Sequence, residues 1–138
     1  MAKSTARRRR ITPEDLQQFI SVADPQVSPD GSRVLLTRGH VGEKNQLVSN
    51  LWIVEADGNV RPFSSGDNDS HSRWSPDGSR IAFTSARNKR RPQIYVLEAT
   101  GGEARALTDL PEGSIGAWTW SPDGRTLAVS FRQTDAGR

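Results

Sequence analysis

The sequence predicts an all-β fold of repeated sheets, and three observations support the prediction. The tetrapeptide Ser-Pro-Asp-Gly occurs three times, at residues 28–31, 75–78 and 121–124. Its first serines, at positions 28, 75 and 121, are spaced by 47 and then 46 residues. A run of β-branched and apolar residues follows each copy. Since a four-stranded propeller blade is about 40 to 50 residues long, the chain is expected to form part of a β-propeller.

The segment before the repeats divides into two parts. Residues 1–10 hold five of the 19 basic residues and are expected to form a disordered basic tail. Residues 11–23 are expected to form a short N-terminal helix and a connector, because Thr12 is a good N-cap and Pro13 suits the first helical position. The helix would carry one apolar stripe, formed by Leu16, Phe19 and Ile20.

Residues 24–138 are expected to form two complete four-stranded blades and half of a third. The expected boundaries are 24–69, 70–115 and, for the incomplete blade, 116–138. Each tetrapeptide would join the first strand of its blade to the second. The second strands are expected at 33–37, 80–84 and 126–130, the third within 50–58 and 93–102, and the fourth within 60–64 and 104–108. Pro62 fits this assignment because a fourth strand is an outer edge, where proline is tolerated.

The tetrapeptide is explained as a tight turn. Proline presets φ at the second position, aspartate tolerates the third and bonds to nearby backbone, and glycine accepts the left-handed conformation that follows. Asp30, Asp77 and Asp123 could instead be metal or catalytic carboxylates. Each turn supplies a single carboxylate, however, whereas a calcium loop needs several oxygen ligands in one segment. The structural interpretation is therefore preferred, and Trp74, Trp118 and Trp120, beside the turns, are expected to pack between blades rather than form a stacking platform.

Sequence motifs for chemistry are missing. The chain contains no cysteine, no Gly-x-Ser-x-Gly and no glycine-rich phosphate loop. Its two histidines, His40 and His71, are expected in loop-like stretches without a positioned nucleophile or an orienting acid. The sequence therefore predicts no catalytic, cofactor-binding or metal-binding residue, no cofactor and no activity of this chain alone, and it leaves substrate-binding residues open.

The basic character lies in the tail and not in the body. The pI is about 9.9, but residues 11–138 hold 14 basic and 16 acidic side chains. Two clusters, Arg7–Arg10 and Arg87–Arg91, could bind phosphate or an acidic partner, and a disordered tail and a solvated loop are the preferred interpretation. We expect no nucleic-acid or membrane partner and a cytoplasmic protein, because no apolar run is long enough to span a bilayer and no signal-peptide core follows the arginines.

Several stretches together resemble one family. "ITPEDLQQFISVADPQVSPDGSRVLL", "NLWIVEADG", "SRWSPDGSRIAFTSARN" and "WTWSPDGRTLAVSF" are similar to WD40-like (PD40) repeats in the N-terminal propeller of prolyl oligopeptidase family (S9) serine peptidases. Within that family the likeness is greatest to acylaminoacyl-peptidase and dipeptidyl-aminopeptidase-like members, and it runs from Ile11 to about Asp135.

The resemblance implies a larger parent protein. In such peptidases a C-terminal α/β-hydrolase domain carries a Ser-Asp-His triad, and the propeller restricts entry to short peptides. No triad residue has a counterpart here, so none is assigned. The expected partner is the hydrolase domain of the same polypeptide, and short peptides would be the substrates of the parent. The alternative is a protein-binding propeller of the Tol or WD40-like type without hydrolase activity.

Overall fold

The structure is a computed structural model that describes residues 8–87 and 91–135 and, within them, every side chain except those of Leu16 and Gln17. Residues 1–7 of the basic tail, including Arg7, and residues 88–90 of the second basic cluster lie outside the described residues.

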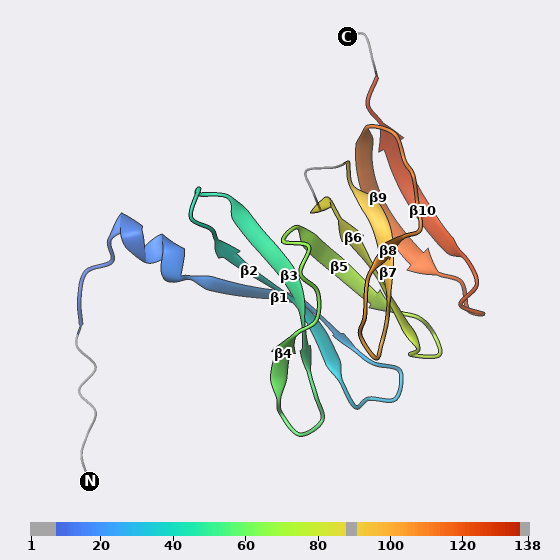
Figure 1. The fold of residues 1–138 in the computed structure, drawn as a ribbon, viewed down its shortest axis with the longest axis horizontal. Coiled ribbons are helices and arrows are strands. Elements are labelled where there is room, and N and C mark those ends of the chain that lie inside the picture. The colour runs from blue at the N-terminus through green and yellow to red at the C-terminus, as the bar shows by residue number, and fades with distance from the viewer. Residues whose placement is uncertain (1–7, 88–90, 136–138) are drawn as a thin grey trace.

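Three antiparallel sheets follow one another along the chain (Figure 1). The first contains β1 (Ile20–Val27), β2 (Val34–Val41), β3 (Leu47–Val54) and β4 (Val60–Pro62). The second contains β5 (Asp69–Trp74), β6 (Arg80–Ser85), β7 (Gln93–Glu98) and β8 (Arg105–Ala106). The third contains β9 (Gly113–Trp120) and β10 (Leu127–Gln133). This architecture confirms the all-β fold with two four-stranded units and a two-stranded third.

Strand order equals sequence order in every sheet, so each sheet is a simple meander. The three tetrapeptides join β1 to β2, β5 to β6 and β9 to β10, as predicted. Pro62 lies in the outermost strand β4, opposite Trp52, where its missing N–H interrupts no ladder. The expected unit boundaries stay predictions; β5 and β9 begin close to them, at Asp69 and Gly113.

The N-terminal segment differs from the prediction. Instead of an α-helix it forms a single 3-10 helix, η1 (Pro13–Gln18), in which Asp15 N–H donates to the Thr12 carbonyl three residues earlier (3.0 Å). Strand β1 then begins at Ile20, inside the segment expected to be a connector, because residues from Ile20 onward pair with the end of β2. The hydrogen bonds between β1 and β2 therefore involve residues that a longer helix would have to include. Phe19 and Ile20 of the expected apolar stripe are exposed.

The first strand of each sheet is interrupted by a bulge. The register shifts between Ala23 and Gln26 in β1 and between Ser70 and Arg73 in β5, and a shift also occurs in the β9–β10 pair. Asp24 (φ 54°) and His71 (φ 53°) occupy equivalent bulge positions, four residues before the first serine of the next turn. The bulges therefore place two ionisable side chains at matching points of neighbouring sheets.

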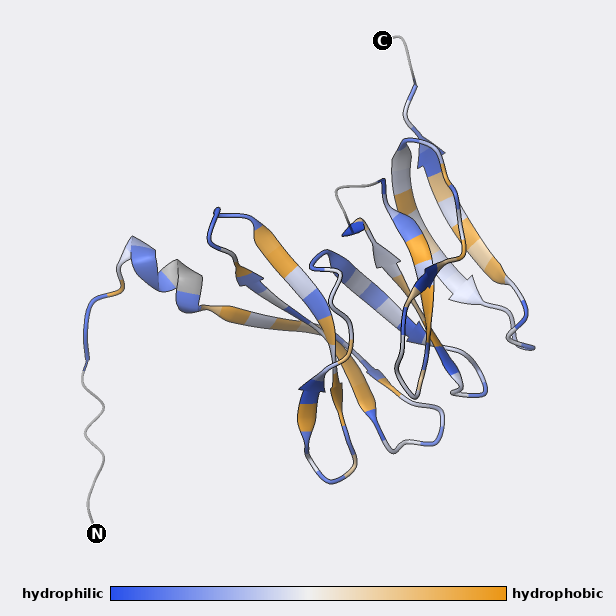
Figure 2. Cartoon of the chain, in the orientation of Figure 1, coloured by the Kyte–Doolittle hydropathy of each residue, from blue (hydrophilic) through white to orange (hydrophobic). Residues whose placement is uncertain are grey.

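Apolar residues concentrate in the strands, and most turns are hydrophilic (Figure 2). The buried apolar residues form two clusters, one at each interface between neighbouring sheets. The first interface, between the first and second sheets, contains Leu35, Leu51, Ile53, Trp74, Ile81, Phe83, Leu97 and Ala99. The second interface, between the second and third sheets, contains Ala82, Ile94 and Trp118, with Ile115, Trp120, Leu127 and Val129 at its margin. Sheet-against-sheet packing is thus the main source of burial.

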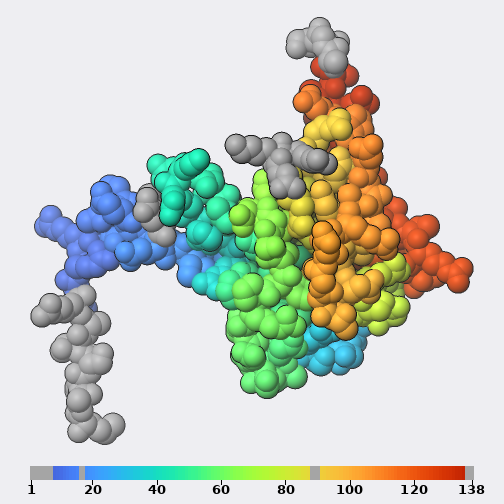
Figure 3. All heavy atoms as spheres, in the orientation of Figure 1, coloured from blue at the N-terminus to red at the C-terminus, as the bar shows by residue number. Residues whose placement is uncertain are grey.

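The N-terminal segment projects from the body formed by the three sheets (Figure 3). Within residues 8–87 and 91–135, no helix is long and apolar enough to cross a bilayer.

Candidate functional site

The three Ser-Pro-Asp-Gly turns have one geometry. In the second unit the Ser75 hydroxyl donates to Asp77 Oδ1 (2.7 Å), which also accepts the N–H (3.0 Å) and the hydroxyl (2.7 Å) of Ser79. Gly78 closes the turn at φ 75°, a region that glycine enters without strain. The first turn repeats all of these bonds around Asp30. The third lacks one, because Arg125 replaces the second serine and donates only its N–H to Asp123.

These hydrogen bonds stabilise the ionised carboxylates. The N–H and hydroxyl of Ser79, with the hydroxyl of Ser75, lower the pKa of Asp77 to about 2. The hydroxyls of Ser28 and Ser32 hold the pKa of Asp30 far below its usual range, and the Ser121 hydroxyl lowers that of Asp123. Each carboxylate is engaged with its own turn. Each tetrapeptide therefore forms the expected tight turn, and its carboxylate accepts hydrogen bonds from that turn.

The tryptophans pack between sheets, as predicted, and two of them make the same hydrogen bond. Trp74 Nε1–H donates to the Gln26 carbonyl (2.9 Å), and Trp120 Nε1–H donates to the Arg73 carbonyl (3.2 Å). Each acceptor lies two residues before the turn of the preceding unit. The indole N–H is satisfied in this way at both interfaces, for the buried Trp74 and the half-buried Trp120.

An arginine of the preceding unit covers each of these indoles. The Arg33 guanidinium carbon lies 5.0 Å from the centroid of the Trp74 ring, and that of Arg80 lies 5.4 Å from the Trp120 ring. Both arginines also donate to a carbonyl of the following unit, Arg33 to Ala99 (3.1 Å) and Arg80 to Gly124 (2.9 Å). We call each such combination of indole and guanidinium a Trp–Arg couple.

The bulge residues make a second contact across each interface. Asp24 forms an ion pair with Arg73 at 2.7 Å, and both side chains are 29% exposed. His71, at the position equivalent to Asp24, instead lies with its ring centroid 5.3 Å from that of Trp118. Burial lowers the pKa of His71, and the nearby Arg73 lowers it further, which favours the neutral imidazole.

A groove of about 360 Å³ lies beside these contacts. It spans the first strands of all three sheets and the neighbouring turns, with Gln26, Arg73, Trp118 and Thr119 among its lining residues. Its mixture of indole surface and a partly exposed guanidinium could hold an apolar group that carries a carboxylate. Arg73 Nη1 already donates to Asp24 and to the Ser72 carbonyl, so the guanidinium in the groove has structural partners within the protein.

The two histidines lie in strands and not in the loops expected from the sequence. His40 is exposed in β2, opposite Val48, and His71 lies in β5. Among the residues the structure describes, neither histidine is hydrogen-bonded to a serine or to a carboxylate. The same part of the chain contains no group of three His, Asp or Glu side chains arranged to hold a metal ion.

Arg87 of the second basic cluster belongs to a buried ion pair rather than to a solvated loop. Its Nη2 lies 3.0 Å from Oδ2 of the fully buried Asp69, which also accepts the Ser85 hydroxyl (2.5 Å) and the Gly66 N–H (2.9 Å). The guanidinium covers the ring of Tyr95, 4.6 Å from its centroid. Arg91 is half-exposed, with Asp109 at 3.8 Å. The two described arginines of this cluster therefore differ, one in a buried ion pair and one at the surface.

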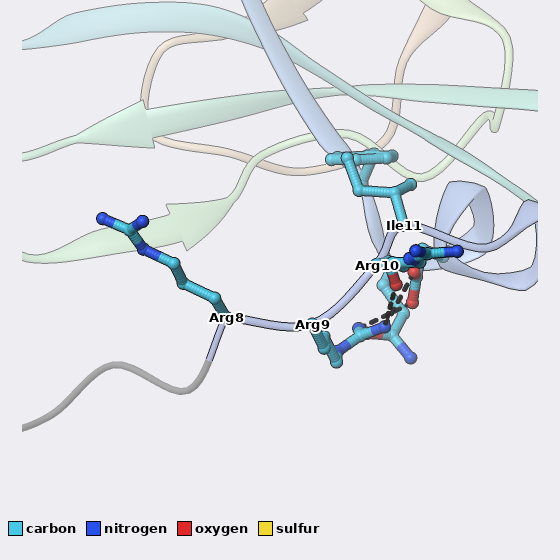
Figure 4. Close-up of a pocket in the computed structure, with 7 residues that line it drawn as sticks. Arg8, Arg9, Arg10 and Ile11 are labelled. Atoms are coloured by element: carbon cyan, nitrogen blue, oxygen red, sulfur yellow. Dashed lines mark hydrogen bonds and ion pairs between the residues drawn. The ribbon is translucent and has the colours of Figure 1, made fainter.

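The described part of the N-terminal arginine cluster lines a pocket of about 680 Å³ with Ile11, Asp15, Gln18 and Phe19 (Figure 4). Arg9 binds both carboxylate oxygens of Asp15 (2.7 and 2.8 Å), whose pKa it lowers, and Arg8 points away from it. Neither Arg8 nor Arg10 forms an ion pair with any described residue. Arg9 thus stabilises the 3-10 helix, and Arg8 and Arg10 are exposed.

The contacts that join the sheets are the part of this site that inspection of the sequence missed. Arg33 and Arg80 both lie five residues after the first serine of their turn, and this fixed offset was a usable signal. The pair between Asp24 and Arg73 gave no such signal, because it joins residues 49 positions apart and occurs once.

Comparisons with known proteins agree with this architecture. The family model described as PD40, TolB beta propeller domain, matches residues 4–136. The chain is 42% identical over 123 residues to the "Uncharacterized peptidase YuxL" of Bacillus subtilis, a match that covers 87% of this chain and 19% of that protein.

Two solved structures show the same fold. TolB from Acinetobacter baumannii is 26% identical with a TM-score of 0.67, over 81% of this chain and 27% of that one. Pyrococcus horikoshii acylaminoacyl peptidase is 24% identical with a TM-score of 0.70, over 83% and 18%. The chain thus spans less than a third of each of these relatives. The resemblance to S9 peptidase propellers is confirmed for the propeller itself, and the chain belongs to the PD40 family of TolB-type β-propeller domains.

Proposed function

We propose that this chain is the N-terminal, non-catalytic propeller part of a serine peptidase that controls the access of peptides to an α/β-hydrolase domain of the same polypeptide. The observation that carries the proposal is the 42% identity to a Bacillus subtilis protein named as a peptidase, of which this chain matches only 19%. The proposal includes a cytoplasmic location, which cell fractionation tests.

The arrangement of the sheets supports a role in access. The three sheets pack side by side, and a groove lined by indoles and a guanidinium crosses their first strands. We expect such a groove to contact a narrow, extended chain rather than a folded one. The chemistry would be acyl transfer to a serine of the hydrolase domain, followed by hydrolysis.

Activity is tested with the full polypeptide and with residues 1–138 alone. We expect the full polypeptide to cleave short aminoacyl and acylaminoacyl chromogenic substrates, in a reaction that a serine-directed inhibitor stops, and the 138-residue chain to give no turnover. Inhibitor-sensitive turnover by the short chain, or a full polypeptide without a Gly-x-Ser-x-Gly segment, would contradict the proposal.

Gating is tested by loosening the first interface in the full enzyme. Arg73→Ala removes the ion pair with Asp24 without deleting apolar packing. We expect kcat/KM for a short chromogenic substrate to stay unchanged and that for a peptide of about 30 residues to rise. Leu47→Ala, at an exposed side chain, is the matched control and should change neither. Equal effects of Arg73→Ala on both substrates would argue against gating.

A second candidate is a protein-binding propeller of the Tol type without hydrolase activity. It is favoured by the family model, described as a TolB propeller domain, and by the 26% identity to TolB. The two candidates differ in the full polypeptide, since only the peptidase gives inhibitor-sensitive turnover. A full polypeptide made only of further propeller units would favour the binding protein.

A further inference from the structure

One repeat position, three residues before the first serine of a turn, is occupied differently at the two interfaces. At the second interface it is Trp118, whose Nε1–H donates to the hydroxyl of Thr84 in the preceding sheet (3.2 Å). At the first interface the same position is Ser72, and the position that corresponds to Thr84, nine residues after the first serine, is Thr37. The first interface therefore has a serine opposite its threonine where the second has an indole.

Both hydroxyl side chains are directed into the first interface. Thr37 lies two residues after Leu35, and the fully buried Ser72 lies two residues before Trp74. Leu35 and Trp74 belong to the cluster of the first interface, and alternate residues of a strand point to the same face of a sheet. Their strands, β2 and β5, are in contact across this interface.

Neither hydroxyl has a hydrogen-bond partner among the residues that the structure describes. Solvent reaches neither Thr37 Oγ1 nor Ser72 Oγ, and within residues 8–87 and 91–135 no other buried side-chain nitrogen or oxygen is left in this way. A buried hydroxyl without a partner lowers stability, so a partner is expected. Because both oxygens are enclosed between two described sheets, a segment outside the described residues could reach them only by displacing packed side chains.

The repeat also indicates how far apart the two hydroxyls are. The Trp–Arg couples join both pairs of sheets by the same bonds, so the sheets are expected to be similarly spaced at the two interfaces. The Trp118 indole reaches the threonine directly, and a serine hydroxyl extends less far from its strand. A water molecule bonded to both hydroxyls would span about 5.5 Å, the length of two O–H···O hydrogen bonds in sequence.

The surroundings favour water over a cation. Thr37 pairs with Ala23, which directly precedes Asp24, and Ser72 directly precedes Arg73. Asp24 and Arg73 form the ion pair of the first bulge, so the carboxylate is already neutralised and the guanidinium would repel a second cation. Internal waters in proteins typically bind buried polar groups that lack other partners.

We propose that a buried water molecule bridges Thr37 Oγ1 and Ser72 Oγ, and that it replaces at the first interface the bond that the Trp118 indole makes at the second. The two sheets of the first interface are then joined at this position through water, and those of the second by a direct bond between side chains. The inference concerns residues enclosed between two described sheets and holds whether or not the parent protein is a peptidase.

A high-resolution crystal structure of the full polypeptide tests the proposal directly. We expect one electron-density peak within about 2.5–3.0 Å of both hydroxyl oxygens. The second interface is the internal control, with no peak between Trp118 and Thr84. The double variant Thr37→Val, Ser72→Ala should lose the peak while the two sheets keep their positions.

Two crystallographic results would overturn the proposal. One is the absence of a peak, with the two hydroxyls bonded to each other or to backbone carbonyls. The other is anomalous scattering from this position in crystals soaked in rubidium chloride, which would identify a monovalent cation in place of water.

A double-mutant cycle on the full polypeptide tests the same bridge in solution. Thr37→Val and Ser72→Ala each remove one partner of the water, so the second substitution should cost less once the first is present. We expect a coupling of at least about twofold in the equilibrium constant of urea unfolding. Thr37→Val combined with Thr84→Val is the matched control, and its effects should add because the two threonines face different interfaces. Additive effects of Thr37→Val and Ser72→Ala would refute the bridge.

Discussion

The first and second interfaces share the same tryptophan and arginine contacts between sheets and differ in the other side chains packed there. Both have an indole bonded to a strand carbonyl and covered by an arginine. The first interface adds a large cluster centred on the fully buried Phe83 and an ion pair at the bulge. The second replaces these with Trp118 against the small residue Ala82 and with a ring contact to His71. The repeated sequence positions therefore determine the contacts that align two neighbouring sheets, while the apolar and charged side chains packed between the sheets can differ from one interface to the next.

The largest expected effect comes from emptying the first interface. Phe83→Ala should lower the free energy of unfolding by about 3–5 kcal/mol, because it removes a fully buried aromatic ring and leaves a cavity. Urea denaturation followed by tryptophan fluorescence measures the change. Leu47→Ala, 70% exposed, is the matched control and should stay within about 0.5 kcal/mol. A loss at Phe83 below 1 kcal/mol would mean that the cluster does not carry the stability of the interface.

Removing the shared indole bond should be the next largest effect and should differ between interfaces. Trp74→Phe removes the donor of the buried indole to the half-buried Gln26 carbonyl and should cost about 1–3 kcal/mol. Trp120→Phe should cost less, about 0.5–1.5 kcal/mol, because Trp120 is only half-buried and its bond is longer. Equal losses in the same denaturation assay would contradict the difference drawn between the two interfaces.

The ion pair at the first bulge should contribute less. Asp24→Asn keeps the shape of the side chain and removes the charge that Arg73 pairs with, at a cost of about 0.5–1 kcal/mol, since both side chains are partly exposed. The loss should shrink at 1 M salt because screening weakens the pair in the unmodified chain. A loss that does not depend on salt would assign the effect to the hydrogen bond from Gln26 instead.

The smallest expected effect is the pH dependence of the three Ser-Pro-Asp-Gly turns, which occur in all three units. Their carboxylates have lowered pKa values, so their stabilisation is present above the unfolded pKa near 4 and is lost as the pH falls through the folded value, about 2 for Asp77. Asp123 accepts one hydrogen bond fewer and should titrate above Asp77. A carboxyl-carbon NMR titration measures both. Titration of Asp123 below Asp77 would contradict this ranking.

The sequence allowed the fold to be predicted further than the site. Turn chemistry and the spacing of the tetrapeptides placed the second, third and fourth strands to within a few residues, because local rules determine turns and strands alternate with them. Strand β3 nevertheless begins at Leu47, before the expected range of 50–58. The 3-10 helix and the early start of β1 were missed, since pairing of Ile20 with His40 competes with the local helix signal around Pro13. Bulges at Asp24 and His71 were also missed, because positive φ at these residues depends on the neighbouring strand.

The partners of charged side chains could not be read from composition. Arg87 was placed in a solvated cluster, and only the fold brings it to Asp69, which lies 18 residues earlier. Likewise, burial lowers the pKa of His71, and the fold brings Trp118, 47 residues later, against its ring, while only Arg73, which lowers the pKa further, is a neighbour in sequence. Contacts that only the folded chain makes, within the second unit for Arg87 and with the third sheet for His71, largely determine these environments.

The meander order of the sheets also bears on how the chain emerges from the ribosome. Each described strand pairs with the strand synthesised just before or just after it, so none of the described sheets depends on pairing with a segment distant in sequence. The first sheet can be completed after about residue 64, and the second can then add to its exposed face and close the Phe83 cluster. Short loops between paired strands favour rapid formation, and nearest-neighbour growth limits the time that apolar faces stay uncovered. Synthesis from the N-terminus would then assemble the sheets in the order in which the Trp–Arg couples join them.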